Sequence, residues 1–175
     1  MKYSQIDRIT ELTPGEKLVG ERTLRPDEEY LQDHFPRLPV MPGVMMLEAL
    51  HQAAVWLVRM TVEPDPPVVL LRETRGVKFG DFLAPGETLT VIAEWMKADG
   101  PLVTVKASAM KGEKRTVTAR LILETCSSGD PDFLGTDPDL ARLAREQFFQ
   151  LYGDSPAVAA LKRSTDRERP TLETH

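Results

Sequence analysis

One stretch decides the fold: His34-Phe35-Pro36-Arg37-Leu38-Pro39-Val40-Met41-Pro42-Gly43, followed by an unbroken run from Val44 to Met60. Proline fixes φ near −65° and favours an extended conformation in the residue before it, so a proline at every third position predicts a braced, polyproline-like strut. The run that follows has no helix breaker and carries apolar residues on nearly every face, which predicts a helix that is buried all round. Its single acid, Glu48, is costly to bury unless it is paired with another group or has a function.

The segments on both sides of this helix alternate between apolar and polar residues, as half-buried strands do. We predict strands at residues 17–24, 68–79, 87–97, 102–110 and 116–125, with turns at Asp99-Gly100-Pro101 and at 111–114. Residues 3–12 indicate a short helix or an extended arm. A long buried helix followed by an antiparallel meander is typical of an α+β fold. Because one helix cannot close a core against a flat sheet, the sheet must curl round it.

The chain has 175 residues, enough for one domain with a sizeable core. We expect a compact domain at 1–126, a linker loop at 127–136, a helical extension at 137–164 and a flexible tail at 165–175. Asp137-Pro138 is a typical helix start, and a second short helix is expected at 156–163. The apolar stripe of this extension must be buried. Packing on the outer face of the sheet is favoured over extending a subunit interface or covering a tunnel mouth.

Composition excludes several classes of function. The net charge of −5 argues against nucleic-acid binding. The single cysteine, Cys126, forms no intrachain disulfide, and residues 1–17 do not form a signal peptide, so a cytoplasmic location is expected. Residues 43–60 include Glu48, His51, Gln52 and Arg59, which favours a buried soluble helix over membrane insertion. No Cys/His cluster has metal spacing and no glycine-rich phosphate loop is present, so no metal site is expected.

The strut and helix carry a resemblance to a known family. His34-Phe35-Pro36-x-x-Pro39-x-x-Pro42-Gly43-Val44, followed by Glu48-Ala49-Leu50-x-Gln52-Ala53, resembles the 3-hydroxyacyl-acyl-carrier-protein dehydratases of fatty-acid synthesis, the FabZ-like group. Asp7-Arg8-Ile9-x-x-Leu12-x-Pro14-Gly15, Val77-Lys78-Phe79 and Pro85-Gly86-Glu87-x-Leu89 extend the resemblance to roughly residues 3–124. It implies the hotdog fold, in which an antiparallel sheet wraps a long central helix, the architecture that the residue pattern also requires.

The residue types suit this chemistry. Dehydration needs a base for the proton beside the thioester carbonyl, an acid for the departing hydroxyl and a donor for the enolate-like oxygen. Histidine titrates near neutrality and suits the base, while burial raises the pKa of a carboxyl so that it can hold a proton. By resemblance His34 is the base and Glu48 the acid. Gly43 stands at the predicted helix start, where its N–H suits the donor, and Gln52 is placed to orient Glu48.

The resemblance also implies partners. In the family the His/Glu pair is completed across a dimer interface, so we expect a homodimer, with larger assemblies of dimers as in relatives. The expected substrate is bound to acyl carrier protein or coenzyme A, and no cofactor is required. The chain departs from the family at Arg37, where glycine is usual, at Gly80-Asp81-Phe82, where a basic, proline-containing stretch is usual, and in its extension after Ser127.

Other residues have two interpretations at this stage. Met41, Met45 and Met46 belong to the core or line an acyl tunnel, and Phe79, Phe82 and Leu83 line that pocket or are plain core. His51 lies on the helix outside the motif and is expected to be packed or hydrogen-bonded. A solvated charged face is favoured over a carrier-docking patch for seven basic residues: Arg37, Arg72, Arg75, Lys78, Lys111, Lys114 and Arg115.

The leading hypothesis is dehydration of 3-hydroxyacyl thioesters, on acyl carrier protein, to trans-2-enoyl thioesters in fatty-acid or related acyl-chain biosynthesis. The related isomerising enzymes often have aspartate at the position of Glu48, so glutamate favours simple dehydration. The alternatives are a hotdog thioesterase or hydratase acting on acyl-CoA, and a non-catalytic acyl-binding subunit. The complete set of base, acid and backbone donor argues against mere binding.

Overall fold

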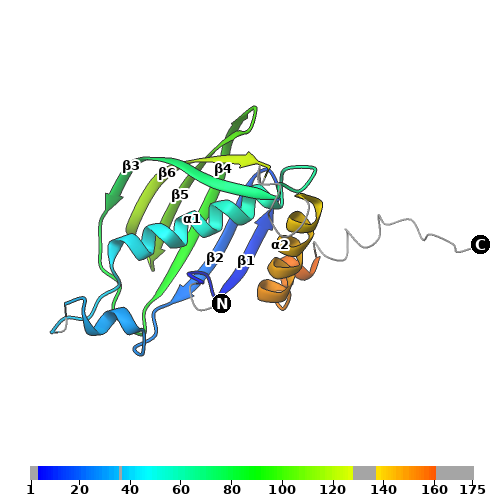
Figure 1. Ribbon diagram of the computed structural model, residues 1–175. Helices are drawn as coiled ribbons and strands as arrows, with labels where there is room; N and C mark the ends of the chain where they lie inside the picture. The colour runs from blue at the N-terminus through cyan, green and yellow to red at the C-terminus, as the bar shows by residue number, and fades with distance from the viewer. Residues whose placement is uncertain (1–3, 36, 128–136, 161–175) are drawn as a thin grey trace, which may run out of the picture.

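The computed structural model describes residues 4–35, 37–127 and 137–160 and consists of one curved antiparallel sheet and two main helices (Figure 1). The sheet has six strands in the order β1-β2-β4-β5-β6-β3. Their bounds are β1 Arg8–Thr13, β2 Lys17–Thr23, β3 Val68–Phe79, β4 Thr88–Asp99, β5 Leu102–Lys111 and β6 Lys114–Cys126. The predicted strands are all present, and the N-terminal segment takes the extended alternative.

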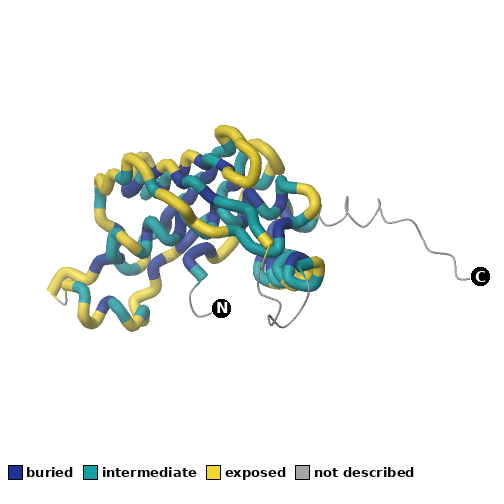
Figure 2. The backbone as a smooth tube through the Cα atoms, turned by 45° about the horizontal axis from the view of Figure 1, so that its top comes forward, coloured by how far each residue is buried: buried dark blue, intermediate teal, exposed yellow. Residues whose placement is uncertain are grey.

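Helix α1 (Gly43–Arg59) crosses the concave face of this sheet, which curls round it as the sequence requires (Figure 1). Alternate residues of the strands point at the helix and are buried, including Leu18, Leu89, Val91, Val105 and Leu121. They meet the buried side of α1, which includes Leu50 and Leu57. Figure 2 shows the buried residues concentrated where the helix and the sheet face one another. The predicted α+β hotdog architecture is confirmed.

The helix is not buried all round, and this part of the sequence prediction is wrong. The sheet covers only part of its circumference, and one side stays open. Val44 is 68% exposed, and the side chain of Glu48 is 43% exposed. Leu47 and Val55 on the same side are only partly buried. No helix in the described ranges combines the length and apolarity needed to cross a membrane.

Strand β3 forms one edge of the sheet and pairs only with β6. Eight of its twelve residues are exposed, among them Leu70 at 41% and Leu71 at 38%. An edge strand offers a row of unpaired backbone N–H and C=O groups to another chain. The exposed leucines and the open side of α1 are therefore two of the apolar surfaces that this fold leaves uncovered in the central domain.

Helix α2 (Asp137–Tyr152) does not lie on the outer face of the sheet, as the sequence had favoured. It packs at the C-terminal end of α1 and beside edge strand β1 (Figure 1). The ring of Phe148 lies 5.1 Å from that of Trp56, and Tyr152 lies 6.0 Å from the same ring. A bidentate ion pair between Arg145 and Asp65 fastens the helix to the loop after α1.

The extension therefore shares the central core. Phe148 and Val158 are fully buried, and Tyr152 is 3% exposed. The second short helix is described for residues 156–160, within the predicted range. The predicted linker, apart from residue 127, and the predicted tail at 165–175 lie outside the described residues.

Candidate active site

His34 follows a 3₁₀ turn (η1, Glu29–Gln32), and its backbone N–H donates to Tyr30 O at 3.0 Å. Its ring Nδ1 lies 2.9 Å from the carbonyl oxygen of Val40. A carbonyl oxygen only accepts hydrogen bonds, so Nδ1 carries the proton in this contact and Nε2 keeps a lone pair. The backbone thus selects the tautomer that a general base needs. The half-buried ring also meets Phe35 edge-on, with centroids 4.6 Å apart.

The strut is only partly the extended segment that its prolines predict. Phe35 has a φ of 53°, which is rare for a residue with a side chain, and Leu38 N–H donates to Phe35 O at 2.8 Å. These two features form a tight turn directly after His34. Pro42, at the other end, has φ −56° and ψ 137°, the polyproline conformation. The turn sets the direction of His34, and the extended end leads into α1.

Gly43 is the first residue of α1, as predicted. The first N–H groups of a helix have no partner within it and lie at its positive end. A Cβ at this position would lie 2.9 Å from Cε1 of Phe79 and 3.1 Å from Cδ1. Glycine is therefore what lets the aromatic ring lie against the start of the helix, next to the backbone N–H.

These residues surround one cavity of about 270 Å³. Its walls come from the strut, the first turn of α1 and the end of β3: His34, Phe35, Met41, Gly43, Met46, Phe79, Gly80, Asp81 and Phe82. The strut is joined to the connection after β3 by a hydrogen bond from Met41 N–H to Leu83 O at 2.8 Å. The cavity places a histidine with a free Nε2 and a helix start beside apolar walls.

Four of the six residues proposed to line an acyl tunnel stand in this wall, namely Met41, Met46, Phe79 and Phe82. Met45 is partly buried on α1, and Leu83 is fully buried in the core, and neither lines the cavity. Met46, by contrast, does line it. Met46 stands one helical turn after Gly43 and so shares its face of α1, which favours Met46 over Met45 as a lining residue.

The loop after β3 is held by one lysine. Lys111 Nζ donates to Phe82 O at 2.7 Å and pairs with Asp81 at 3.0 Å and Glu87 at 3.3 Å. The hydrogen bond from Lys111, followed by that from the Phe82 backbone, holds the pKa of Asp81 below its ordinary value. Gly80 N–H bonds to Thr116 O at 2.8 Å. The family usually has a basic stretch at this position. Here Asp81 stands in its place, and its positively charged partner, Lys111, comes from β5.

Gly80→Ala is expected to disturb the cavity wall. A Cβ at this position would lie 2.6 Å from the carbonyl oxygen of Arg115, which is backbone and cannot turn aside. We expect a loss of about 1–3 kcal/mol in the free energy of unfolding, measured by urea titration, together with a higher KM for the acyl substrate. Unchanged values of both quantities would contradict this close approach.

Glu48 sits on the open side of α1, and both of its carboxylate oxygens accept hydrogen bonds. Oε2 lies 3.1 Å from His51 Nδ1, and Oε1 accepts from Gln52 Nε2 at 2.9 Å. The bond to His51, helped by that to Gln52, lowers the pKa of Glu48, although burial opposes this. The sequence argument that burial raises the pKa of this acid is therefore wrong for the single chain, because the side chain is half-exposed and doubly bonded.

Gln52 is fixed in turn by a polar chain that sequence reasoning missed. Its Oε1 accepts from Gln5 N–H at 2.8 Å, and Gln5 Oε1 lies 3.4 Å from Arg22 Nε. Arg22 is 1% exposed and pairs with Asp7 and Glu28. Burial lowers its pKa, but these acids together raise it above the ordinary value. The signal was present, because Arg22 falls on the inward face of the alternating strand 17–24.

His34 and Glu48 are not brought together within one chain. Glu48 does not line the cavity that contains His34, and its oxygens are bonded to His51 and Gln52. His34 and Gly43 do share that cavity. A single described chain therefore places the expected base and backbone donor together and the expected acid elsewhere, on the uncovered side of α1.

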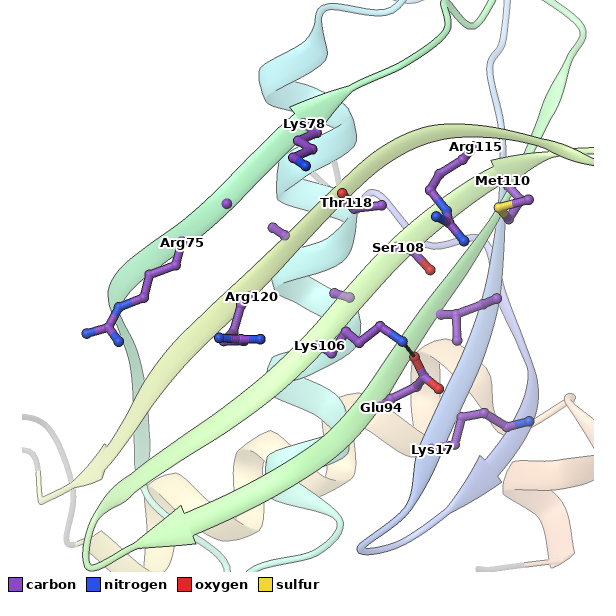
Figure 3. A pocket seen from close by; sticks show the side chains of 14 residues that line it. Lys17, Arg75, Lys78, Glu94, Lys106, Ser108, Met110, Arg115, Thr118 and Arg120 are labelled. Atoms are coloured by element: carbon purple, nitrogen blue, oxygen red, sulfur yellow. Dashed lines mark ion pairs between the residues drawn. The ribbon is translucent and has the colours of Figure 1, made fainter.

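The predicted basic residues are spread over the surface. Arg75, Lys78 and Arg115 border a wide hollow of about 790 Å³ on the outer face of the sheet, together with Lys106 and Arg120 (Figure 3). Several cations there or nearby are already paired with acids of the chain: Lys106 with Glu94, Arg75 with Glu73 and Arg72 with Glu124. The interpretation as a solvated face stays a prediction.

Comparison with known proteins places this geometry in a family. Residues 1–120 match the FabA-like domain. The chain is 34% identical over 125 residues to the 3-hydroxyacyl-[acyl-carrier-protein] dehydratase FabZ of Levilactobacillus brevis, covering 71% of this chain and 84% of that protein. It is 35% identical over 116 residues to the FabZ of Pediococcus pentosaceus, covering 66% and 78%.

Solved structures agree on the fold. A chain of the dehydratase heterocomplex ApeI:P from Xenorhabdus doucetiae superposes with a TM-score of 0.60 at 17% identity, covering 73% of this chain and 86% of that one. The resemblance expected from the His34 and Glu48 motifs is confirmed by the sequence matches. The chain belongs to the FabZ-like hotdog dehydratases of the FabA-like family.

Proposed function

We propose that this protein dehydrates 3-hydroxyacyl thioesters carried by acyl carrier protein to trans-2-enoyl thioesters, as a step of fatty-acid biosynthesis. One observation carries the proposal: His34 has its Nδ1 bound to Val40 O at 2.9 Å, so its Nε2 is free as a base in the same cavity as Gly43. The names of the curated relatives support the same reaction. The reaction needs one proton removed and one proton donated, and His34 and Glu48 can carry out these two transfers.

In the proposed mechanism the thioester oxygen accepts a hydrogen bond from Gly43 N–H at the positive end of α1. His34 Nε2 removes a proton from the carbon beside the carbonyl, and those electrons form the new double bond. The bond between the next carbon and its hydroxyl oxygen breaks, and Glu48 donates the proton that turns the leaving group into water. Each acid–base group of this kind contributes about 10²–10⁴-fold to the rate.

The acid of each site comes, in this proposal, from a second copy of the chain. Glu48 lies on the side of α1 that the sheet leaves open, beside the exposed Val44. A two-fold dimer that covers this side would bury Val44, Leu47 and Val55 and bring Glu48 toward the partner's cavity. The exposed leucines of edge strand β3, Leu70 and Leu71, offer a second apolar contact.

The acyl chain is proposed to run along the apolar wall of the cavity, past Met41, Met46, Phe79 and Phe82. Phe79 is 53% exposed and Phe82 is 63% exposed, although both are large apolar side chains. Exposed aromatic residues beside a cavity are typical of a ligand-binding mouth. A cytoplasmic location belongs to this proposal as well, since Cys126 is a free thiol and the proposed carrier substrate is an intracellular one.

The test is to incubate the purified protein with a 3-hydroxyacyl thioester and follow the conjugated enoyl product by absorbance and mass spectrometry. Parallel reactions with carrier-protein and coenzyme A thioesters decide which carrier is used. Release of free thiol would identify a thioesterase instead. Tight acyl binding without turnover would identify a binding subunit, and either result would overturn the proposed dehydration.

A further inference from the structure

His51 is the polar residue of α1 that the proposed reaction has not yet used. It lies one turn after Glu48, at a position that the family motif leaves unspecified. Its Nδ1 is 3.1 Å from Glu48 Oε2, and its side chain is 24% exposed. Its other nitrogen, Nε2, is buried and has no hydrogen-bond partner among the described residues. The imidazole therefore directs one nitrogen to the proposed acid and keeps the other away from solvent.

This contact conflicts with a simple acid role for Glu48. A general acid must hold a proton, but both oxygens of Glu48 accept hydrogen bonds, one from His51 and one from Gln52. Hydrogen bonds of this kind favour the ionised carboxylate. A carboxylate that is held ionised has no proton to give to a leaving hydroxyl. The proton must then be stored next to it, and an imidazole is the side chain that holds a proton near neutral pH.

We propose that His51 is a positioning residue of this site, which fixes Glu48 and shares with it the proton that the leaving hydroxyl receives. The inference rests on the proposed dehydration. In the charged pair, His51 Nδ1–H donates to Glu48 Oε2. As the carbon–oxygen bond breaks, the Nδ1 proton moves to Glu48 and Glu48 passes it to the hydroxyl oxygen, which leaves a neutral imidazole beside the carboxylate. His34 gains one proton in the same turnover, and exchange with solvent resets both groups.

Within one described chain few other charges act on this pair, and in the proposed dimer the His34 of the second copy would face it as well. Gln52 is neutral and lies on the same helix. The strand side chains packed against α1 are mainly apolar, and the charged exception, Arg22 of β2, bonds to Gln5, Asp7 and Glu28. Among the described residues, the only titratable group that contacts Glu48 is His51. The proton that the two side chains share then sets the upper limb of the activity profile.

Two variants separate positioning from proton sharing. His51→Ala removes both the hydrogen bond and the ionisable group. His51→Gln keeps an N–H donor within reach of Glu48 but cannot hold an ionisable proton. Leu143→Ala, at an exposed position of α2 outside the site and the proposed dimer contact, is the control for a general effect of substitution. All four full-length proteins are compared by kcat and KM across pH, and by circular dichroism and size-exclusion chromatography.

For both His51 variants we expect the upper limb of the kcat profile to move to lower pH by about one unit or more. At about pH 8 this is a loss of at least about tenfold in kcat, with KM changed by less than about twofold. Leu143→Ala should keep the wild-type profile. The loss comes from the missing ionisable group, so glutamine should not restore it.

An upper limb that stays in place in both folded His51 variants would overturn the inference. An upper limb that moves in His51→Ala but keeps its wild-type position in His51→Gln would also overturn the inference. In that case the orientation of Glu48 alone would explain the contact with His51. These failures differ from failure of the proposed function. In that case the wild-type protein itself would not convert the 3-hydroxyacyl thioester at any pH.

Discussion

Replacing His34 by alanine lowers kcat by about 10²–10⁴-fold, and Glu48→Gln has a loss of the same order. His34 Nε2 is the free nitrogen in the cavity, and without it no base remains near the carbon beside the thioester carbonyl. The measurement is steady-state formation of the enoyl product. Gln32→Ala, two residues from His34 and exposed, is the matched control and should keep the wild-type rate.

Mixing the two inactive variants tests whether each site draws on two chains. If His34 of one copy works with Glu48 of another, subunit exchange creates dimers with one intact site. An equal mixture should then regain roughly a quarter of the wild-type activity for random two-fold pairing. No recovery after demonstrated subunit exchange would place both groups in the same chain. Full activity in both single variants would refute their assigned roles.

Phe148→Ala should produce a large loss of stability, about 3–5 kcal/mol in the free energy of unfolding. Phe148 is fully buried and lies against Trp56 of α1 and Tyr152 of its own helix. The cavity left by the ring would open the junction between the C-terminal helix and the central core. Urea and thermal unfolding measure the loss, and Tm should fall by about 2–4 °C for each kcal/mol.

Leu143→Ala is the control on the same helix. Leu143 is 50% exposed, so its replacement should change the free energy of unfolding by no more than about 0.5 kcal/mol. Equal effects of the two substitutions would mean that α2 contributes no specific packing. A single unfolding transition that shifts as a whole with Phe148→Ala would support a shared core, whereas a separate early transition would indicate an independent extension.

The regular elements were predictable because each depends on local rules. Alternating apolar residues place β4 to β6, and the unbroken run after Gly43 gives α1. The helix pattern does not say what covers each face. Apolar residues that stay exposed in the single chain, such as Val44, look the same in sequence as residues of the internal core. The expected burial of Glu48, and with it the expected direction of its pKa shift, failed for this reason.

Other features depend on contacts between distant segments and have no local signal. The turn after His34 requires a φ of 53° at Phe35, which no glycine or asparagine announces. The packing of α2 on Trp56 and the Arg145–Asp65 ion pair both join segments that are far apart in sequence. His34 and Gly43 were assigned to one site only through the family resemblance, because an extended strut alone would hold them apart.

Ionic strength should act on the acyl cavity through Lys111. This single cation ties Asp81, Glu87 and the Phe82 carbonyl together, and the acids are partly open to solvent. Salt screens exposed ion pairs of this kind, so a higher salt concentration should loosen the cavity wall that carries Phe82. We expect KM for an uncharged acyl thioester analogue to rise by about twofold between low and high salt, with kcat nearly constant. Lys111→Met should remove that salt dependence.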